Sequence, residues 1–145
     1  MAKSRQYEFG RVFLARLPHK GDLLESITMF CADSELGAGF VSAIGAVQSA
    51  TVGYYDQKAH EYRTISFHEP MEIASLAGNL SVKDGQPMLH AHVVFSRENG
   101  KAVGGHLMSP TVVFAGEVFA VELCGEPLVR EFDEPTGLPL WAALR

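Results

Sequence analysis

The sequence contains few cysteines. Only Cys31 and Cys124 occur among its 145 residues, far apart in the chain and without C-x-x-C spacing. Two thiols exclude the disulfide framework of small secreted domains, and they are too few for a cysteine-rich structural zinc site. We therefore expect two buried free thiols rather than a disulfide, in a protein of a reducing cytoplasm.

Long apolar runs are also missing. No run approaches the roughly 18 residues that a membrane-spanning helix needs. The opening residues Met1–Gln6 lack the apolar stretch that is typical of a secretory signal. We expect a cytoplasmic protein that has no membrane partner.

Positive charge is scarce, with 12 Lys and Arg against 17 Asp and Glu and a formal net charge of −5. Non-specific binding to nucleic acid depends on clustered cations that displace counterions, so this balance argues against a DNA-binding surface. The one local basic bias lies at the start of the chain, at Lys3, Arg5, Arg11, Arg16 and Lys20. A solubilising surface explains that bias equally well.

The remaining composition, 47% hydrophobic and 20% charged, is typical of a globular protein. The length fits one domain, and no repeat or linker divides the chain. We expect a single domain over residues 1–145 with a core from about 7 to 128. The tail that follows is expected to be irregular, with a short packed segment at Trp141.

The apolar pattern predicts one helix and a series of strands. Asp22 is a candidate N-cap for a helix whose apolar residues recur at helical spacing from Leu23 to Phe30, and Gly37 and Gly39 are expected to end it. Strand patterns cover residues 7–17, 40–44, 47–56, 62–67, 71–82, 88–96 and 111–123, with tight turns at Asp84-Gly85 and Asn99-Gly100. This order predicts an α+β fold built on a mainly antiparallel sheet with short turns.

Three histidines stand at positions that suit one metal ion. Side chains alternate along a strand, so His90 and His92 share a face. After the Asn99-Gly100 turn, a returning strand would bring His106 beside them, and Gly104-Gly105 would allow close backbone approach or a bulge. We interpret the three as a metal site; the alternative is ordinary polar residues on an exposed sheet face.

Three protein ligands with one open position are typical of catalytic zinc. Imidazole also suits nickel, copper and iron, so another divalent transition metal remains an alternative to zinc. The other histidines, His19, His60 and His68, are not expected to be ligands.

Further candidates are weaker. Glu72 and Glu117 lie in apolar surroundings and could act as a general base or support an imidazole, whereas exposure on an alternating strand explains them as well. Arg97 could bind an anion in bidentate fashion or be a solvated turn residue. Tyr54 and Tyr55 could line a pocket or pack across strands.

Several motifs together resemble one known family. They are Ile44–Val47, Val52–Asp56, Glu69–Glu72, Ser75–Leu80, His90–Ser96 and Gly104–Leu107. In this order they look like the plants-and-prokaryotes-conserved (PPC) domain in its bacterial stand-alone form. The resemblance implies an α+β fold with an antiparallel sheet and a homotrimer, and it alone singles out Asn79 and Ser81 as ligand contacts.

The resemblance also bears on function. In plants such domains follow AT-hooks in DNA-binding proteins, but this sequence has no Arg-Gly-Arg-Pro core to grip the minor groove. The histidine pattern is similar to that of acetolactate decarboxylases, a family with this type of fold, whose three histidines hold zinc. That likeness implies zinc ligands at His90, His92 and His106, and does not extend to decarboxylation.

Three functions are therefore left open. The first is a metal-binding domain that binds or acts on a small anionic molecule through a Lewis-acidic ion or an activated water. The second is a DNA-binding or regulatory trimer in which the metal is structural or incidental. The third is a purely structural trimer. Whether the protein is an enzyme stays open, as does the identity of a substrate.

Overall fold

The computed structural model describes residues 4–142. These residues form one helix, α1 (Leu23–Asp33), and eight strands. The strands are β1 (Glu8–Arg16), β2 (Gly39–Asp56), β3 (Glu61–Phe67), β4 (Met71–Lys83), β5 (Gln86–Ser96), β6 (Ala102–Cys124), β7 (Arg130–Asp133) and β8 (Leu138–Trp141). The expected α+β class with a mainly antiparallel sheet is confirmed.

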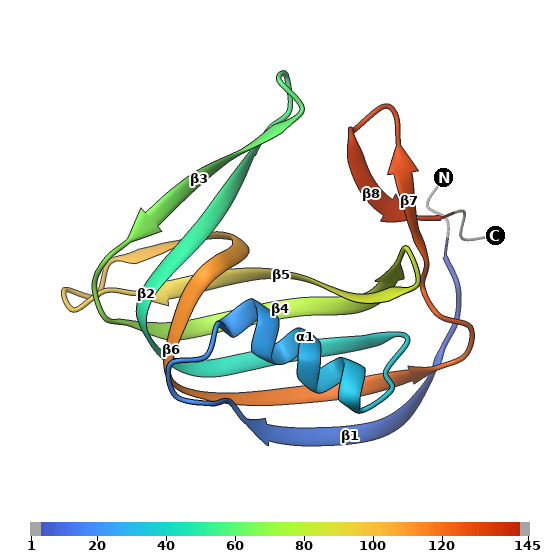
Figure 1. Cartoon of the computed structure of the whole chain (residues 1–145), viewed down its shortest axis with the longest axis horizontal. Coiled ribbons are helices and arrows are strands. Elements are labelled where there is room, and N and C mark those ends of the chain that lie inside the picture. Colours follow the sequence, from blue (N-terminus) through green and yellow to red (C-terminus); the bar gives the residue numbers. More distant parts are fainter. Residues whose placement is uncertain (1–3, 143–145) are drawn as a thin grey trace.

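The main sheet has the order β1-β6-β5-β4-β2-β3, and an additional pairing of β6 with β2 closes β2, β4, β5 and β6 into a ring. All these pairings are antiparallel. β2 and β6 have 18 and 23 residues and change partners along their lengths. One end of β2 therefore rises with β3 away from the rest of the sheet (Figure 1).

The two strand patterns expected at 40–44 and 47–56 are parts of one strand, β2. A bulge near Gly45 separates them, where the register against β4 shifts. Gly45 has φ of +139°, and a Cβ there would lie 2.2 Å from the carbonyl oxygen of Ala115. A bulge bends a strand without ending it, so Gly45 changes the direction of β2 and the strand continues beyond it.

Helix α1 covers one face of the sheet (Figure 1). Its apolar face buries Leu23, Ile27 and Cys31 against a core that includes Leu76 and Phe95. As expected, Asp22 caps the helix, accepting a hydrogen bond from the Glu25 amide at 2.9 Å.

The helix ends earlier than Gly37 and Gly39 predict. Helix α1 ends at Asp33, before Gly37. The amides of Glu35 and Leu36 donate to the carbonyls of Ala32 and Cys31, and Glu35 has φ of +55°. This is a Schellman ending in which glutamate takes the left-handed position usually held by glycine, so the sequence signal is absent.

We expect Asp22→Ala to lower the free energy of unfolding by about 2 kcal/mol. The Asp22 carboxylate caps α1 and also accepts hydrogen bonds from the Ser109 hydroxyl and the buried Thr111 amide, both at 2.7 Å. Urea denaturation measures the change. Asp33→Ala, at the exposed other end of the helix, is the control, and an equal loss in both variants would contradict this role of Asp22.

The C-terminal tail is not irregular, contrary to expectation. β7 and β8 form a hairpin whose turn is held by the Asp133 carboxylate, which accepts hydrogen bonds from the amide and the hydroxyl of Thr136. Pro135 and Pro139 are typical of irregular structure, yet both are compatible with a short two-stranded ribbon. The hairpin rises from the sheet near the β4–β5 turn (Figure 1).

The two cysteines are free, as expected, but only Cys31 is buried. Burial raises the pKa of the Cys31 thiol to about 11, which keeps it unreactive. Cys124 is exposed, because it ends β6 opposite Glu8 of the edge strand β1. Within residues 4–142, no helix is both long and apolar enough to cross a membrane.

Candidate metal centre

The candidate centre lies on the face of β5 that points away from the core. Leu89, Ala91 and Val93 are buried, whereas His90 and His92 alternate with them and reach the opposite face. His106 of β6 stands directly opposite His92 in the antiparallel register. The spacing on β5 and the return through β6 thus bring the three expected side chains to one place.

The two glycines before His106 let β6 fit between its neighbours. A Cβ on Gly104 would lie 2.2 Å from the carbonyl oxygen of Val93 on β5. A Cβ on Gly105 would lie 2.8 Å from the carbonyl oxygen of Gly53 on β2. The expected close backbone approach is confirmed, and His106 is held from both sides, paired with His92 and with Gly53.

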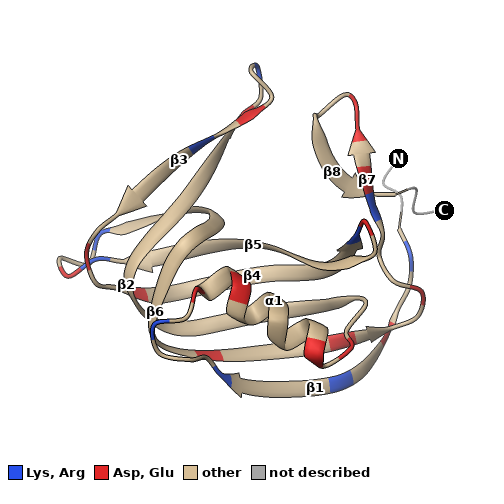
Figure 2. Ribbon diagram, viewed as in Figure 1, with Lys and Arg blue, Asp and Glu red and all other residues tan. Residues whose placement is uncertain are grey.

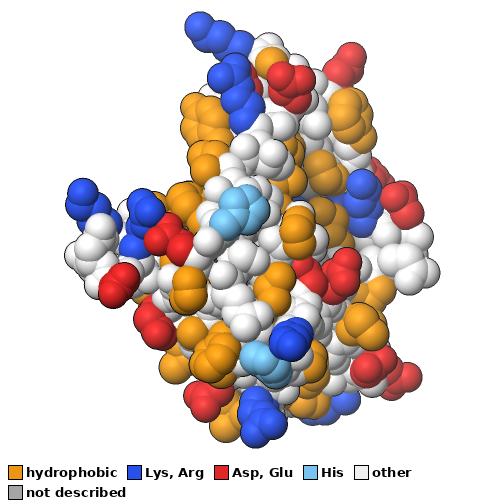
Figure 3. Space-filling model, turned by 60° about the vertical axis from the view of Figure 1, so that its left-hand side comes forward, with side chains coloured by type: hydrophobic (Ala, Val, Ile, Leu, Met, Phe, Trp, Pro, Cys, Tyr) orange, Lys and Arg blue, Asp and Glu red, His pale blue; other side chains and the backbone are white. Residues whose placement is uncertain are grey.

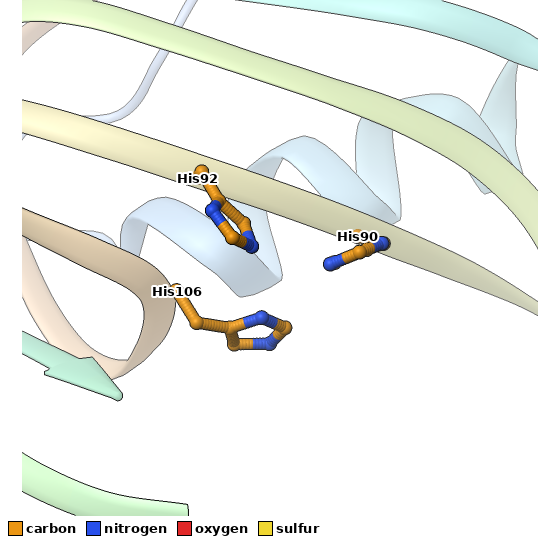
Figure 4. Close-up of side chains that lie close together, drawn as sticks. All are labelled: His90, His92 and His106. Carbon is orange, nitrogen blue, oxygen red and sulfur yellow. The ribbon is translucent and has the colours of Figure 1, made fainter. Parts of the chain in front are cut away.

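The three imidazoles face a common space (Figure 4). One ring nitrogen from each lies within 4.8 Å of the other two, and the ring centroids are 5.0–5.5 Å apart. Nitrogens bound to one tetrahedral zinc at about 2.0–2.1 Å are roughly 3.4 Å apart. Small rotations of the side chains would therefore bring these donors into bonding range, and the donor set fits zinc.

The surroundings keep two of the imidazoles neutral. Burial, with contributions from the Arg130 charge and from His92, lowers the pKa of His90. Burial and the neighbouring His90, His92 and Arg130 lower the pKa of His106 to about 4. Only a neutral imidazole binds a metal ion, so both side chains are ready ligands at neutral pH.

The lowered pKa of His106 predicts acid sensitivity of the metal-free protein. The unfolded chain takes up a proton on this residue near pH 6.5, whereas the folded chain does so only near pH 4. Its contribution to stability is complete above about pH 6.5 and is lost as the pH falls towards 4. We expect urea denaturation to show a smaller loss between pH 7 and pH 5 for His106→Gln than for wild type. Equal losses would contradict this.

Two side chains that sequence reasoning missed touch the cluster. Tyr62 of β3 places its hydroxyl 3.5 Å from Nδ1 of His106. Arg130 of β7 places Nη2 3.4 Å from Nδ1 of His90. Tyr62 sits on an alternating strand, and Arg130 lies in a tail that looked irregular, so neither carried a sequence signal. Asn79 and Ser81, which the family resemblance singled out, both accept hydrogen bonds from Arg130.

Glu72, Arg97 and Glu117 do not join the histidines. Glu72 and Arg97 line a separate cavity of about 630 Å³. Glu72 is five residues along β4 from Ala77, the partner of His92, which is about 17 Å at the rise of an extended strand. Arg97 forms an ion pair with Glu69 at 2.6 Å. Glu117 lies opposite Arg16 of β1 and Ile44 of β2 in the strand register, far along β6 from His106.

The remaining histidines and tyrosines also have separate surroundings. Nδ1 of His19 is 2.8 Å from the carbonyl oxygen of Phe114, and His60 stacks on Tyr55. His68 lines another cavity, beside Phe67. Tyr54 is exposed, whereas the Tyr55 ring packs against Tyr62.

Fold and site together define a small antiparallel β domain with a three-histidine cluster on the outer face of its sheet. The family model of the Plants and Prokaryotes Conserved (PCC) domain matches residues 4–124. The chain belongs to this family. No curated protein sequence matches it.

Solved structures agree with this assignment. A metal-containing protein from Archaeoglobus fulgidus is 47% identical, with a TM-score of 0.92. The match covers 97% of this chain and 99% of the chain from Archaeoglobus fulgidus. A plant- and prokaryote-conserved protein from Pyrococcus horikoshii is 36% identical, with a TM-score of 0.91 and 98% of each chain covered. A protein from Bacteroides thetaiotaomicron, provisionally assigned as DNA-binding, is 27% identical, with a TM-score of 0.84 and 97% and 100% covered.

Proposed function

We propose that the protein binds a divalent transition metal ion, zinc in the first place, through His90, His92 and His106. The observation that carries this proposal is the convergence of three imidazole nitrogens within 4.8 Å. The metal-containing relative from Archaeoglobus fulgidus supports it. Two lowered histidine pKa values favour the neutral, ligating form.

The proposed centre has a position left for a small anionic ligand. Three protein ligands leave one site of a tetrahedral zinc ion open, where a bound ion acts as a Lewis acid or lowers the pKa of water. His92 is exposed, so the cluster is accessible from solvent. The part of the chain that the structure describes brings no carboxylate into the group, so the open position would be filled from outside.

Metal content tests the proposal. The protein is purified without a histidine tag, supplied with zinc, dialysed and assayed by inductively coupled plasma mass spectrometry. We expect about one zinc ion per chain at neutral pH. A wild-type protein that retains no stoichiometric metal would refute the proposal.

We also propose that the chain forms a homotrimer. An apolar surface on β1, β2 and β6 supports this, with Leu14 82%, Val12 59% and Phe40 47% exposed. Leu14 pairs with Phe119, Phe119 with Ser42, Ser42 with Ala77 and Ala77 with His92. Directly opposed residues share a face, so this surface continues into the histidine face. Contiguous exposed apolar patches mark interaction surfaces.

Light scattering coupled to size-exclusion chromatography tests the trimer. The expected mass is about three times the 15.8 kDa of one chain. Leu14→Ser, on the apolar surface, should shift the protein towards monomer, whereas Lys58→Ser, in the exposed β2–β3 turn, should not. A wild-type monomer at micromolar concentration would overturn this proposal.

Charge distribution argues against the alternative of DNA binding. Charged residues of both signs are interspersed along the ribbon (Figure 2), and their side chains are interspersed over the face shown in space-filling form (Figure 3). Within the N-terminal basic bias, Arg5 pairs with Glu126 and Arg11 with Glu122; Lys3 lies outside the described residues. We expect no binding to duplex DNA in a low-salt titration; salt-sensitive binding would favour the alternative instead.

A further inference from the structure

Arg130 is a buried cation without a counter-ion. The residue is 7% exposed, and within residues 4–142 no carboxylate lies at ion-pair distance from its guanidinium. Its hydrogen bonds go to neutral groups: the Ser81 hydroxyl at 2.6 Å, the Asn79 side-chain oxygen at 2.7 Å and the Pro139 carbonyl at 2.8 Å. Buried charges are normally paired, so this guanidinium calls for an explanation.

The unpaired guanidinium lies beside the histidine cluster. Nη2 of Arg130, on β7, is 3.4 Å from Nδ1 of His90, on β5. A divalent ion on the three neutral imidazoles would put a second positive charge close to the guanidinium. The two charges repel each other, and an anion in contact with both would relieve that repulsion.

The C-terminal hairpin holds Arg130 in this place. The matched family domain ends at residue 124, whereas Arg130 belongs to β7, and its guanidinium lies 5.8 Å from the ring centroid of Trp141 on β8. The hairpin turn is tied to the β2–β3 arm by the Tyr55 hydroxyl, which donates to the Thr136 carbonyl at 2.6 Å. The hairpin is therefore positioned to take part in the site.

We propose that Arg130 binds the carboxylate of a small organic anion that occupies the open position of the metal centre. This inference rests on the proposed metal binding and names the class of ligand. Four of the five N–H groups of the Arg130 guanidinium contact Ser81, Pro139, Asn79 and His90, which leaves one N–H on Nη1 to donate a charge-assisted hydrogen bond to a carboxylate oxygen. The aromatic ring of Tyr62, beside His106, offers an apolar neighbour for the organic part of such a ligand.

Calorimetric titration of the zinc-loaded protein with acetate, and separately with inorganic phosphate, tests the proposal. We expect acetate to bind wild type, and Arg130→Lys to weaken it by about 10-fold or more. Arg97→Lys is the matched control, because its guanidinium pairs with Glu69 away from the histidines; its acetate affinity should equal that of wild type. Arg130→Met should bind zinc alone at least as tightly as wild type, since the repelling charge is gone.

The outcomes separate this inference from the metal centre itself. If wild type takes up no zinc, the metal centre and this inference both fail. If zinc binds but acetate affinity is the same in wild type and Arg130→Lys, the inference alone fails. Tighter binding of phosphate than of acetate would overturn the carboxylate class, and weaker zinc binding by Arg130→Met would assign Arg130 a purely structural role.

Discussion

His92→Ala is expected to weaken zinc binding by well over 100-fold while leaving the fold intact. Loss of an outer partner of a metal ligand already costs about 10–100-fold. Here one of only three protein donors would be removed, and the two remaining imidazoles leave zinc with an incomplete donor set. His92 is an exposed residue on the outer face of β5, so its truncation opens no cavity in the core. Competition against a fluorescent zinc chelator measures the change.

His68→Ala is the matched control for this variant. His68 is an exposed histidine outside the cluster, between β3 and β4. The His68→Ala variant should bind zinc as wild type does. When free of metal, His68→Ala and His92→Ala should unfold at similar urea concentrations. Equal zinc affinity in wild type and His92→Ala would show that the ion is held elsewhere.

Gly104→Ala is expected to lower the free energy of unfolding by about 3 kcal/mol or more. The added Cβ would lie 2.2 Å from the Val93 carbonyl oxygen and 3.1 Å from the Val94 Cα, so main-chain atoms of β5 would have to move. For a domain of this size the melting temperature should fall by roughly 10 °C. The shift would also separate His106 from His92, so zinc affinity should fall with stability. Differential scanning calorimetry measures the first effect and chelator competition the second.

Gly116→Ala provides the same substitution on the same strand in a more forgiving place. Its Cβ would meet the end of the flexible Leu17 side chain at 3.0 Å, and the next nearest atoms belong to that side chain too. We expect a loss of about 1 kcal/mol or less, with zinc affinity unchanged. Equal stability losses at the two glycines would refute the close approach of β6 to β5.

The histidine cluster was predictable because its geometry is local. A two-residue period places His90 and His92 on one face of β5, and a short turn fixes the return of β6. The glycines at 104 and 105 carry the signal for close strand approach, which the structure confirms. The sequence spacing therefore predicts the same neighbours, His90, His92 and His106, that the strand register brings together.

Other parts of the site depend on contacts that no local pattern contains. Arg130 reaches His90 across 40 positions of the chain, and Tyr62 reaches His106 across 44. Both contacts involve hairpins, β2–β3 and β7–β8, that rise from the same side of the sheet (Figure 1). Glu72 is a candidate that the structure places away from the site. Its apolar neighbours Met71 and Ile73 indicate a strand, but they do not show how far Glu72 lies from the histidines.

Diffraction from crystals of the zinc-loaded protein, recorded on both sides of the zinc absorption edge, would locate the ion directly. We expect one anomalous peak per chain, about 2.0–2.1 Å from a ring nitrogen of each of His90, His92 and His106. A zinc-bearing crystal with no peak among these three side chains would contradict a metal centre at this place in the fold.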